Sequence, residues 1–195
     1  MRSLLKIAAV CAATLSLAAC ATITSAPAGD YKVASDYTVT LGRQWSDMSA
    51  AIMGKPKKVR MLSIDGVFLN RLYLVDGLAP GEFIVKAASK DKPTPVYHSG
   101  MSPTELVEFV SDSTSALGYD RVETSHLRPA SISGTDGIRF DVAAQTPEGL
   151  DIAGTGMVVE RAGKLYVNLY LAPKEHYYDA YLPEVEKVFA SARFS

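Results

Sequence analysis

The sequence contains few of the residues that build metal centres, disulfides and redox sites. Two cysteines, Cys11 and Cys20, and three histidines occur among 195 residues. No HxxxH or HxH pair is present, and neither a G-x-S-x-G elbow nor a P-loop motif occurs. The formal charge of −1 at pH 7 excludes the strongly basic surface that is typical of nucleic-acid-binding domains. We therefore expect no metal, no cofactor and no nucleic-acid partner.

The first twenty residues have the three parts of an export signal. Arg2 and Lys6 give a basic start, residues 7–17 form a short apolar run, and small residues follow. A transmembrane helix is the competing interpretation, but it needs about 20 apolar residues, and this run is shorter. We expect residues 1–19 to be removed, which leaves enough chain for one domain.

The end of this signal carries a more specific motif. Leu17-Ala18-Ala19-Cys20 resembles the lipobox of bacterial lipoproteins. The resemblance implies cleavage before Cys20, a diacylglyceryl group on its thiol and acylation of the new amine. Two or more acyl chains make anchoring stable, so the membrane is the first expected partner. Ala21 stands where Asp would favour the inner membrane, which favours the periplasmic face of the outer membrane. With Cys11 removed and Cys20 lipidated, the mature chain keeps no free thiol.

Hydropathy patterning predicts the organisation of the remaining chain. Residues 20–35 are small and polar, and they are predicted to be the lipidated terminus and a flexible tether. Residues 36–195 are predicted to form one domain. Asp65-Gly66 indicates a hairpin turn. The predicted strands are 36–41, 59–64, 67–75, 82–87, 121–127, 138–144, 150–160 and 165–171, and the predicted helices are 43–53, 103–117 and 178 or 183 to 192.

The helix over 103–117 has the clearest signals. Ser102 is the expected N-cap, Glu105 completes a capping box, Pro103 occupies the first helical position, and Gly118 ends the helix. The order of elements predicts an α+β domain in which helices pack on a single antiparallel sheet. Together with the meander over 138–171 and the ending over 177–194, this order resembles the PsbP-like fold, an α/β/α sandwich. The resemblance implies a binding or assembly module.

Glycines inside the predicted meander add two expectations. Asp136-Gly137 is predicted to be a turn. Gly154 and Gly156 lie within the strand over 150–160, where they indicate either a bulge or a close backbone approach.

The strand over 165–171 suggests a binding surface. Leucine and valine alternate there with Tyr166, Asn168 and Tyr170, and Tyr177 and Tyr178 follow. Tyrosine combines apolar area with a polar tip, so this second face is a candidate partner-binding surface. Alternatively, a helix covers it, and the tyrosines are packing residues.

Catalytic candidates are few. His176 and Asp179 are three residues apart, so they could share a helix face as a base and its orienter, or form an ordinary surface pair. We expect a membrane-anchored, non-enzymatic binding or assembly module. Its partner would be an envelope protein, a lipid or a cell-wall component. The alternatives are a hydrolase-like envelope enzyme with a site assembled only in three dimensions, and a purely structural envelope protein.

Overall fold

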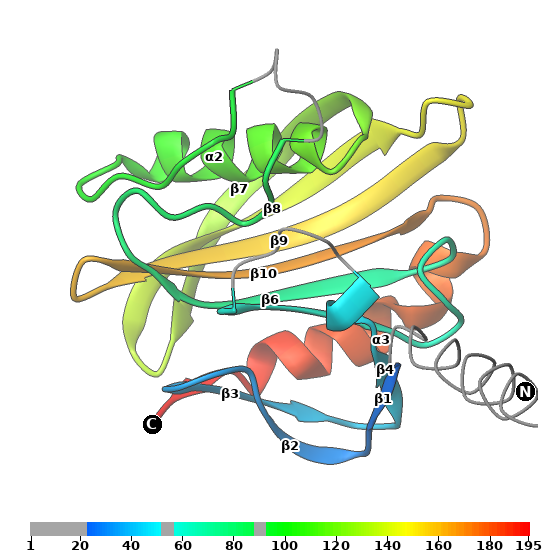
Figure 1. Ribbon diagram of the computed structural model, residues 1–195, viewed down its shortest axis with the longest axis horizontal. Helices are drawn as coiled ribbons and strands as arrows, with labels where there is room; N and C mark the ends of the chain where they lie inside the picture. Colours follow the sequence, from blue (N-terminus) through cyan, green and yellow to red (C-terminus); the bar gives the residue numbers. More distant parts are fainter. Residues whose placement is uncertain (1–22, 52–56, 88–92) are drawn as a thin grey trace, which may run out of the picture.

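The computed structural model describes residues 23–51, 57–87 and 93–195. These residues form an eight-stranded sheet and a three-stranded sheet, in which every paired neighbour is antiparallel. Helix α2 (Pro103–Ala116) covers one face of the large sheet, and α3 (Tyr177–Ala190) and the small sheet cover the other (Figure 1). The predicted α+β class is confirmed.

The strand order of the large sheet is β1 (Thr24–Ala26), β4 (Trp45–Asp47), β5 (Val59–Ser63), β6 (Arg71–Leu78), β10 (Lys164–Pro173), β9 (Asp151–Arg161), β8 (Thr135–Gln145) and β7 (Asp120–Ile132). The strand order of the small sheet is β11 (Arg193–Phe194), β3 (Tyr37–Leu41) and β2 (Gly29–Lys32).

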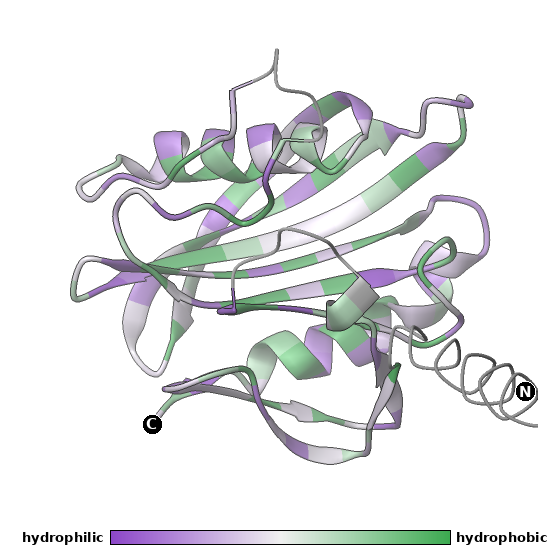
Figure 2. Cartoon of the chain, viewed as in Figure 1, coloured by the Kyte–Doolittle hydropathy of each residue, from purple (hydrophilic) through white to green (hydrophobic). Residues whose placement is uncertain are grey.

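Helix α2 begins as its sequence predicts. The Glu105 amide donates to Ser102 Oγ at 3.3 Å, and the Ser102 amide donates to Glu105 Oε2 at 2.6 Å, so the capping box is complete. Gly118 follows the C-cap with a φ of +96°, which glycine adopts without strain. Leu106, Val107, Phe109 and Val110 face the sheet, and the hydrophobic and hydrophilic colours alternate along both helices (Figure 2). The helix is therefore held by one apolar stripe.

Strand β10 shows why the centre of the sheet is buried on both sides. Leu165, Val167, Leu169 and Leu171 join the core under α2, whereas Tyr166 and Tyr170 join the core under α3. The predicted alternation is confirmed. Because both faces are covered, every residue of β10 after Lys164 is buried.

Gly156 confirms the expected close approach within the meander. It pairs with Phe140 on β8, and a Cβ atom at position 156 would overlap the Phe140 ring. At Gly154 a Cβ would lie 2.7 Å from the carbonyl oxygen of Tyr170 on β10. Neither position has room for a side chain without a shift of its neighbours.

Strand β7, which forms one edge of the large sheet, is irregular. Its pairing with β8 shifts register between Asp120 and Glu123 and again between Ser125 and Arg128. Arg121 and His126 have positive φ angles of 49° and 50°. These interruptions twist the strand and break the regular row of backbone groups along its outer edge.

Several local predictions are wrong because contacts with distant residues outweigh the helix or strand propensity of the segment. The helix expected over 43–53 is instead β4 followed by a short 3₁₀ turn (Ser49–Ala51), since Trp45 is buried and pairs with Ala26. Residues 52–56 lie outside the described residues. The strand expected over 82–87 is not formed: the Glu82 amide turns back to the Ala79 carbonyl at 3.0 Å, and the Glu82 carbonyl accepts from the Tyr97 amide at 2.8 Å.

Two expected turns also differ. Asp136 and Gly137 lie inside β8, and the turn is made by Ser133 and Gly134, whose φ angles are 48° and 75°. Asp65-Gly66 opens a longer connection over 64–70, where the Asn70 carboxamide accepts from the Ser63 hydroxyl at 2.9 Å and from the Ile64 amide at 2.7 Å.

The segment predicted to be a tether is structured in its described part. Strands β1 and β2 fall within 24–32, and they pair with β4 and β3. Ala26 is buried in the core under α3 and Tyr31 packs against it, so the segment is held by these contacts and by the ladders to neighbouring strands. Cys20 lies outside the described residues. Within the described chain, no helix is both long and apolar enough to cross a membrane.

Candidate functional site

The face of β10 that carries the tyrosines is not exposed to solvent. Tyr166, Asn168 and Tyr170 are at most 2% exposed. The Tyr37 hydroxyl donates to Asn168 Oδ1 at 2.8 Å, and the Tyr170 ring stacks on Tyr178 with centroids 5.8 Å apart. Helix α3 and the small sheet cover this face. The partner-binding prediction is therefore wrong for these three residues, and the packing alternative is confirmed.

Tyr177 and Tyr178, the other predicted contact residues, open α3 and pack against the same core. Both are partly exposed. Their role in partner binding remains a prediction.

The predicted catalytic pair does not form a site. His176 and Asp179 are both exposed, and the His176 ring contacts Tyr177 at a centroid distance of 5.1 Å. His98 lies before α2 on the opposite side of the sheet from His176, and His126 lies 3.2 Å from Asp141 on β7–β8. In the described part of the chain, no three His, Cys, Asp or Glu side chains are arranged to hold a metal ion. The described histidines therefore do not converge.

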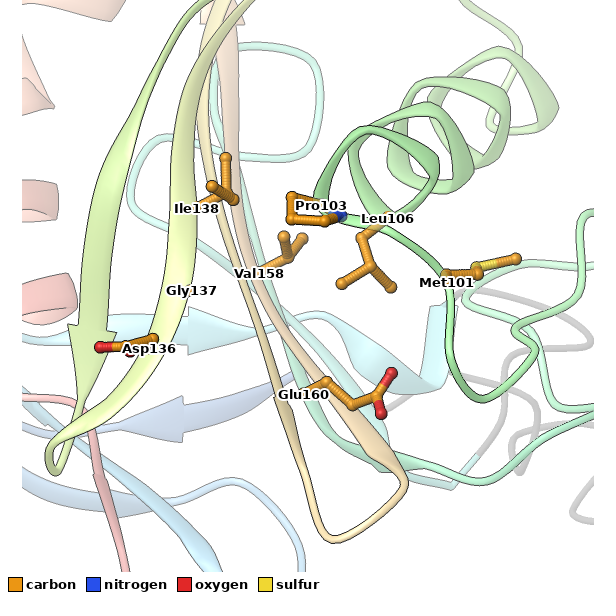
Figure 3. A pocket seen from close by; sticks show the side chains of 8 residues that line it. All are labelled: Met101, Pro103, Leu106, Asp136, Gly137, Ile138, Val158 and Glu160. Atoms are coloured by element: carbon orange, nitrogen blue, oxygen red, sulfur yellow. The ribbon is translucent and has the colours of Figure 1, made fainter.

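A cleft lies between the N-terminal end of α2 and strands β8 and β9. Its volume is about 330 Å³. Figure 3 shows Pro103, Leu106 and Val158 directed toward the same space, while the Glu160 carboxylate extends from β9 on the helix side. The charged residues of the lining are Asp136 and Glu160, both acidic. The complete lining is Met101, Pro103, Leu106, Asp136, Gly137, Ile138, Val158 and Glu160.

The buried Tyr97 hydroxyl interacts with the Glu160 carboxylate, and Glu160, but not Tyr97, lines the cleft. Tyr97 is fully buried, and burial, together with the nearby Glu160 carboxylate, raises the pKa of its hydroxyl.

The backbone around these two side chains is firmly held. The Tyr97 amide donates to the Glu82 carbonyl at 2.8 Å, and the Tyr97 carbonyl accepts from the Gly81 amide at 2.7 Å. The Tyr97 ring meets Phe109 of α2 edge-on, with centroids 6.4 Å apart. Glu160 pairs with Leu165 across the β9–β10 ladder. The polar atoms are thus presented by rigid elements, as a binding site requires.

The N-terminal half of α2 makes the surroundings of the cleft acidic. Glu105, Glu108 and Asp112 line a second hollow of about 290 Å³, which shares Met101 with the cleft and includes His98. The helix contains no basic residue. Apart from His98, the charged or titratable side chains that line the two hollows are therefore all acidic.

A carboxylate pair on the other face ties the β2–β3 connection to β6. Asp76 is 1% exposed and accepts from the Ser35 amide at 2.6 Å and from the Asp36 amide at 3.3 Å. Burial, and after it the neighbouring Asp36, raises the pKa of Asp76, while the Ser35 hydroxyl lowers the pKa of Asp36. Because backbone amides occupy a buried Asp76 oxygen, we interpret this pair as a structural latch.

The sequence did not point to the cleft. Tyr97 lies in a Pro-containing loop, and Glu160 is a single carboxylate near the end of an apolar strand. The one available signal was that Glu160 interrupts the apolar run Met157-Val158-Val159. Nothing in the sequence pairs it with Tyr97.

The arrangement of one large antiparallel sheet between α2 and α3 is a PsbP-like fold. Among solved structures, it is similar to cyanobacterial PsbP (CyanoP) from Synechocystis sp. PCC 6803. That likeness has a TM-score of 0.52 and 13% sequence identity, and covers 92% of this chain and 96% of that chain. The PsbP-like fold predicted from the element order is therefore confirmed.

A weaker likeness, which does not establish a shared fold, is to LpqN, described as involved in cell envelope biogenesis of Mycobacterium tuberculosis. It has a TM-score of 0.40 and 8% identity, and covers 89% of this chain and 91% of that chain. No family model and no curated protein sequence matches this chain.

Proposed function

We propose that this protein is a lipid-anchored, non-enzymatic binding module of the bacterial cell envelope. In this proposal, acyl chains on Cys20 hold it to the membrane, and the cleft between α2 and β9 binds another envelope component. Ala21 favours the periplasmic face of the outer membrane. The observation that carries the proposal is the mostly apolar cleft itself, with the Glu160 carboxylate in its lining.

The shape and chemistry of the cleft support binding more than catalysis. Ligand sites are concave and mostly apolar, with a few convergent polar groups. The cleft has this character, whereas the candidate acid–base residues His176 and Asp179 are exposed and do not line it.

The anchor is tested by labelling cells with an alkyne analogue of palmitate. We expect the full-length chain to be labelled and to fractionate with membranes, and Cys20→Ser to abolish both. A chain that carries no label would overturn the anchored part of the proposal.

The cleft is tested by photocrosslinking in cells, with a photoreactive residue placed at Ile138 of the full-length protein. Phe68 is the matched control, because it is 84% exposed on the 64–70 loop and does not line the cleft. We expect one discrete adduct from position 138 and none from position 68, and we expect the adduct to be lost in Glu160→Gln. Equal crosslinking from both positions, or a hydrolytic activity that a single substitution abolishes without unfolding the chain, would sink the binding-module proposal.

A further inference from the structure

We infer that the β1 edge of the domain, with Ile23, Lys57 and Arg60, lies on the anionic phospholipid surface that holds the lipid anchor. This inference rests on the proposed function, because it requires acyl chains on Cys20. Three observations support it: the short length of chain between Cys20 and β1, the side chains around the start of this strand, and its place at one edge of the large sheet.

The chain between the anchor and the folded domain is short. Ile23 comes three residues after Cys20, and β1 begins at the next residue, Thr24. A fully extended chain advances at most about 3.6 Å per residue, so the Cα atoms of Cys20 and Ile23 are at most about 11 Å apart. Strand β1 is fixed to β4 by the ladder that ends in the pair Ala26–Trp45. A bilayer that holds Cys20 is therefore close to the β1 edge.

The start of β1 lies beside a basic part of β5. Strands β1 and β5 both pair antiparallel with β4, so they run in the same direction, about two strand spacings of 4.8 Å apart. Asp47 of β4 pairs with Thr24 of β1 and with Leu62 of β5. Arg60 comes two residues before Leu62, so it lies on the side from which the chain enters β1. Arg60 Nη1 donates to the Lys57 carbonyl at 2.8 Å, which places the guanidinium beside a second basic residue.

The side chains at this edge suit a layer of phospholipid headgroups. Ile23 is 60% exposed, Lys57 is exposed, and Arg60 is half-buried. An exposed apolar side chain can enter the interface of a bilayer, and basic side chains close to an anionic leaflet are attracted to it. The nearby Asp47 carboxylate accepts from the Tyr31 hydroxyl at 2.8 Å. The β1 edge thus combines apolar and basic groups, which an anionic lipid surface binds.

This orientation directs the cleft away from the bilayer. Strands β1 and β7 form the two edges of the large sheet, and Figure 1 shows α2 and β7 on the opposite side of the molecule from β1. Six strand spacings separate β1 from β8, which amounts to roughly 29 Å. A ligand of the cleft between α2, β8 and β9 therefore does not compete with the lipid surface for the same face.

The test places the full-length lipoprotein in nanodiscs of phosphatidylethanolamine and phosphatidylglycerol that contain a lipid with a nickel-chelating headgroup. Once Cys11 is removed and Cys20 is lipidated, the chain has no free thiol, so a single spin label can be attached at any chosen position. Nickel shortens the relaxation time of a spin label that lies near the headgroups. The relaxation enhancement at each position therefore measures its proximity to the lipid surface.

Three label positions separate the anchor from the orientation of the domain. Ile23→Cys reports the anchor, because its distance from Cys20 is limited by the chain. Ala50→Cys reports the β1 edge, because Ala50 is exposed and follows Ser49, whose hydroxyl accepts from the Met61 amide of β5 at 3.0 Å. Leu127→Cys is the matched control on β7, where Leu127 is 48% exposed. We expect a severalfold stronger enhancement at Ala50 than at Leu127.

Charge variants locate the contact. Arg60→Gln should lower the docked population about fivefold, which is the effect of one basic charge near an anionic surface, and the label at Ala50 measures this loss. Arg121→Gln, an exposed basic residue on β7, should behave as the wild type. Thermal unfolding checks that each variant folds. If Arg60→Gln does not fold, Lys57→Gln, which changes an exposed side chain, provides the second comparison.

The outcomes distinguish failure of the anchor from failure of the docking surface. No enhancement at any of the three positions would overturn both. Strong enhancement at Ile23 with equal values at Ala50 and Leu127 would leave the anchor and overturn the inference, because the domain would then turn freely about its anchor. An enhancement at Ala50 that neither Arg60→Gln nor Lys57→Gln lowers would also overturn the inference, since the basic side chains would then take no part in the contact.

Discussion

The two faces of the large sheet are closed to different degrees. Under α3, the core around Tyr166 is filled: its ring lies 5.6 Å from Tyr37 and 4.7 Å from Phe194, centroid to centroid. The hollow of about 260 Å³ on this side lies at the β9–β10 turn and is lined mostly by polar residues. Under α2, the helix and the segment before it leave a mostly apolar cleft of about 330 Å³, and the Glu160 carboxylate in its lining interacts with Tyr97.

This difference separates stability from binding within one sheet. A filled face contributes dispersion contacts and apolar burial over its whole area. A partly open face gives up some of that burial and keeps concave space for a ligand. Substitutions on the two faces should therefore differ in cost, and the following predictions run from the largest expected effect to the smallest.

Truncating one buried apolar residue on each face probes the difference. Phe189→Ala removes a ring that is 3% exposed and lies under the Arg139 guanidinium, 4.4 Å from the ring centroid. We expect a loss of about 3–5 kcal/mol in the free energy of unfolding. Leu106→Ala only widens an existing cleft and should cost about 2 kcal/mol. Urea unfolding of both variants measures the two values, and the reverse order would contradict the comparison.

A second variant probes the polar centre of the filled face. Tyr37→Phe removes the hydrogen bond to Asn168 Oδ1 and leaves the buried carboxamide wholly unpaired. We expect a loss of about 1–3 kcal/mol. Tyr37→Phe combined with Asn168→Leu replaces both partners by apolar groups and should recover most of that loss. A double variant less stable than the single one, measured by urea unfolding, would argue that Asn168 has further partners.

The carboxylate latch on the filled face predicts a pH dependence. The pKa of Asp76 is raised, so the folded chain binds this proton more tightly than the unfolded chain does. Stability therefore falls as pH rises from about 4, the ordinary aspartate value, through the raised pKa. The pKa of Asp36 is lowered, so its effect on stability has the opposite sign. Its contribution to the free energy of unfolding is lost only as pH falls below the ordinary aspartate value of about 4. Asp76→Asn should flatten the fall above pH 4 in melting temperature, and a slope that persists in this variant would refute the assignment.

The smallest effect is expected at the tip of the 64–70 loop. Phe68 is 84% exposed, so Phe68→Ser should change the free energy of unfolding by less than about 0.5 kcal/mol. Asn70, two residues away, is 1% exposed and holds the loop through Ser63 and Ile64. Asn70→Ala should cost about 1–3 kcal/mol. Similar losses in both variants, measured by thermal unfolding, would show that Phe68 is not free of the core.

Local physics made part of this structure predictable from the sequence. The capping box at Ser102 and the alternation along β10 are short-range signals, and both are confirmed. The strand pattern could not tell which face would be covered. That depends on Tyr37, which reaches Asn168 across 131 positions of the chain. In the same way, β1 and β2 form because they pair with β4 and β3, and no property of residues 24–32 alone indicates a strand.

The cleft was beyond the reach of sequence patterns for a related reason. Tyr97 and Glu160 become a pair only because a loop crosses the α2 face and brings a phenol near the end of β9. Each residue on its own has an ordinary interpretation, as a core aromatic and as a strand-end charge. Their interaction with each other is a property of the three-dimensional structure, and neither residue alone indicates it.

The irregular outer strand has a consequence for how copies of this protein behave when they are crowded. An outer strand with a regular row of amide and carbonyl groups is a template for further strands and hence for fibres. In β7 the row is broken by two register shifts and by Pro129, which has no amide hydrogen to offer. Polymerisation by edge-to-edge growth is thereby disfavoured along this border, because neighbouring copies find no regular strand edge there to extend.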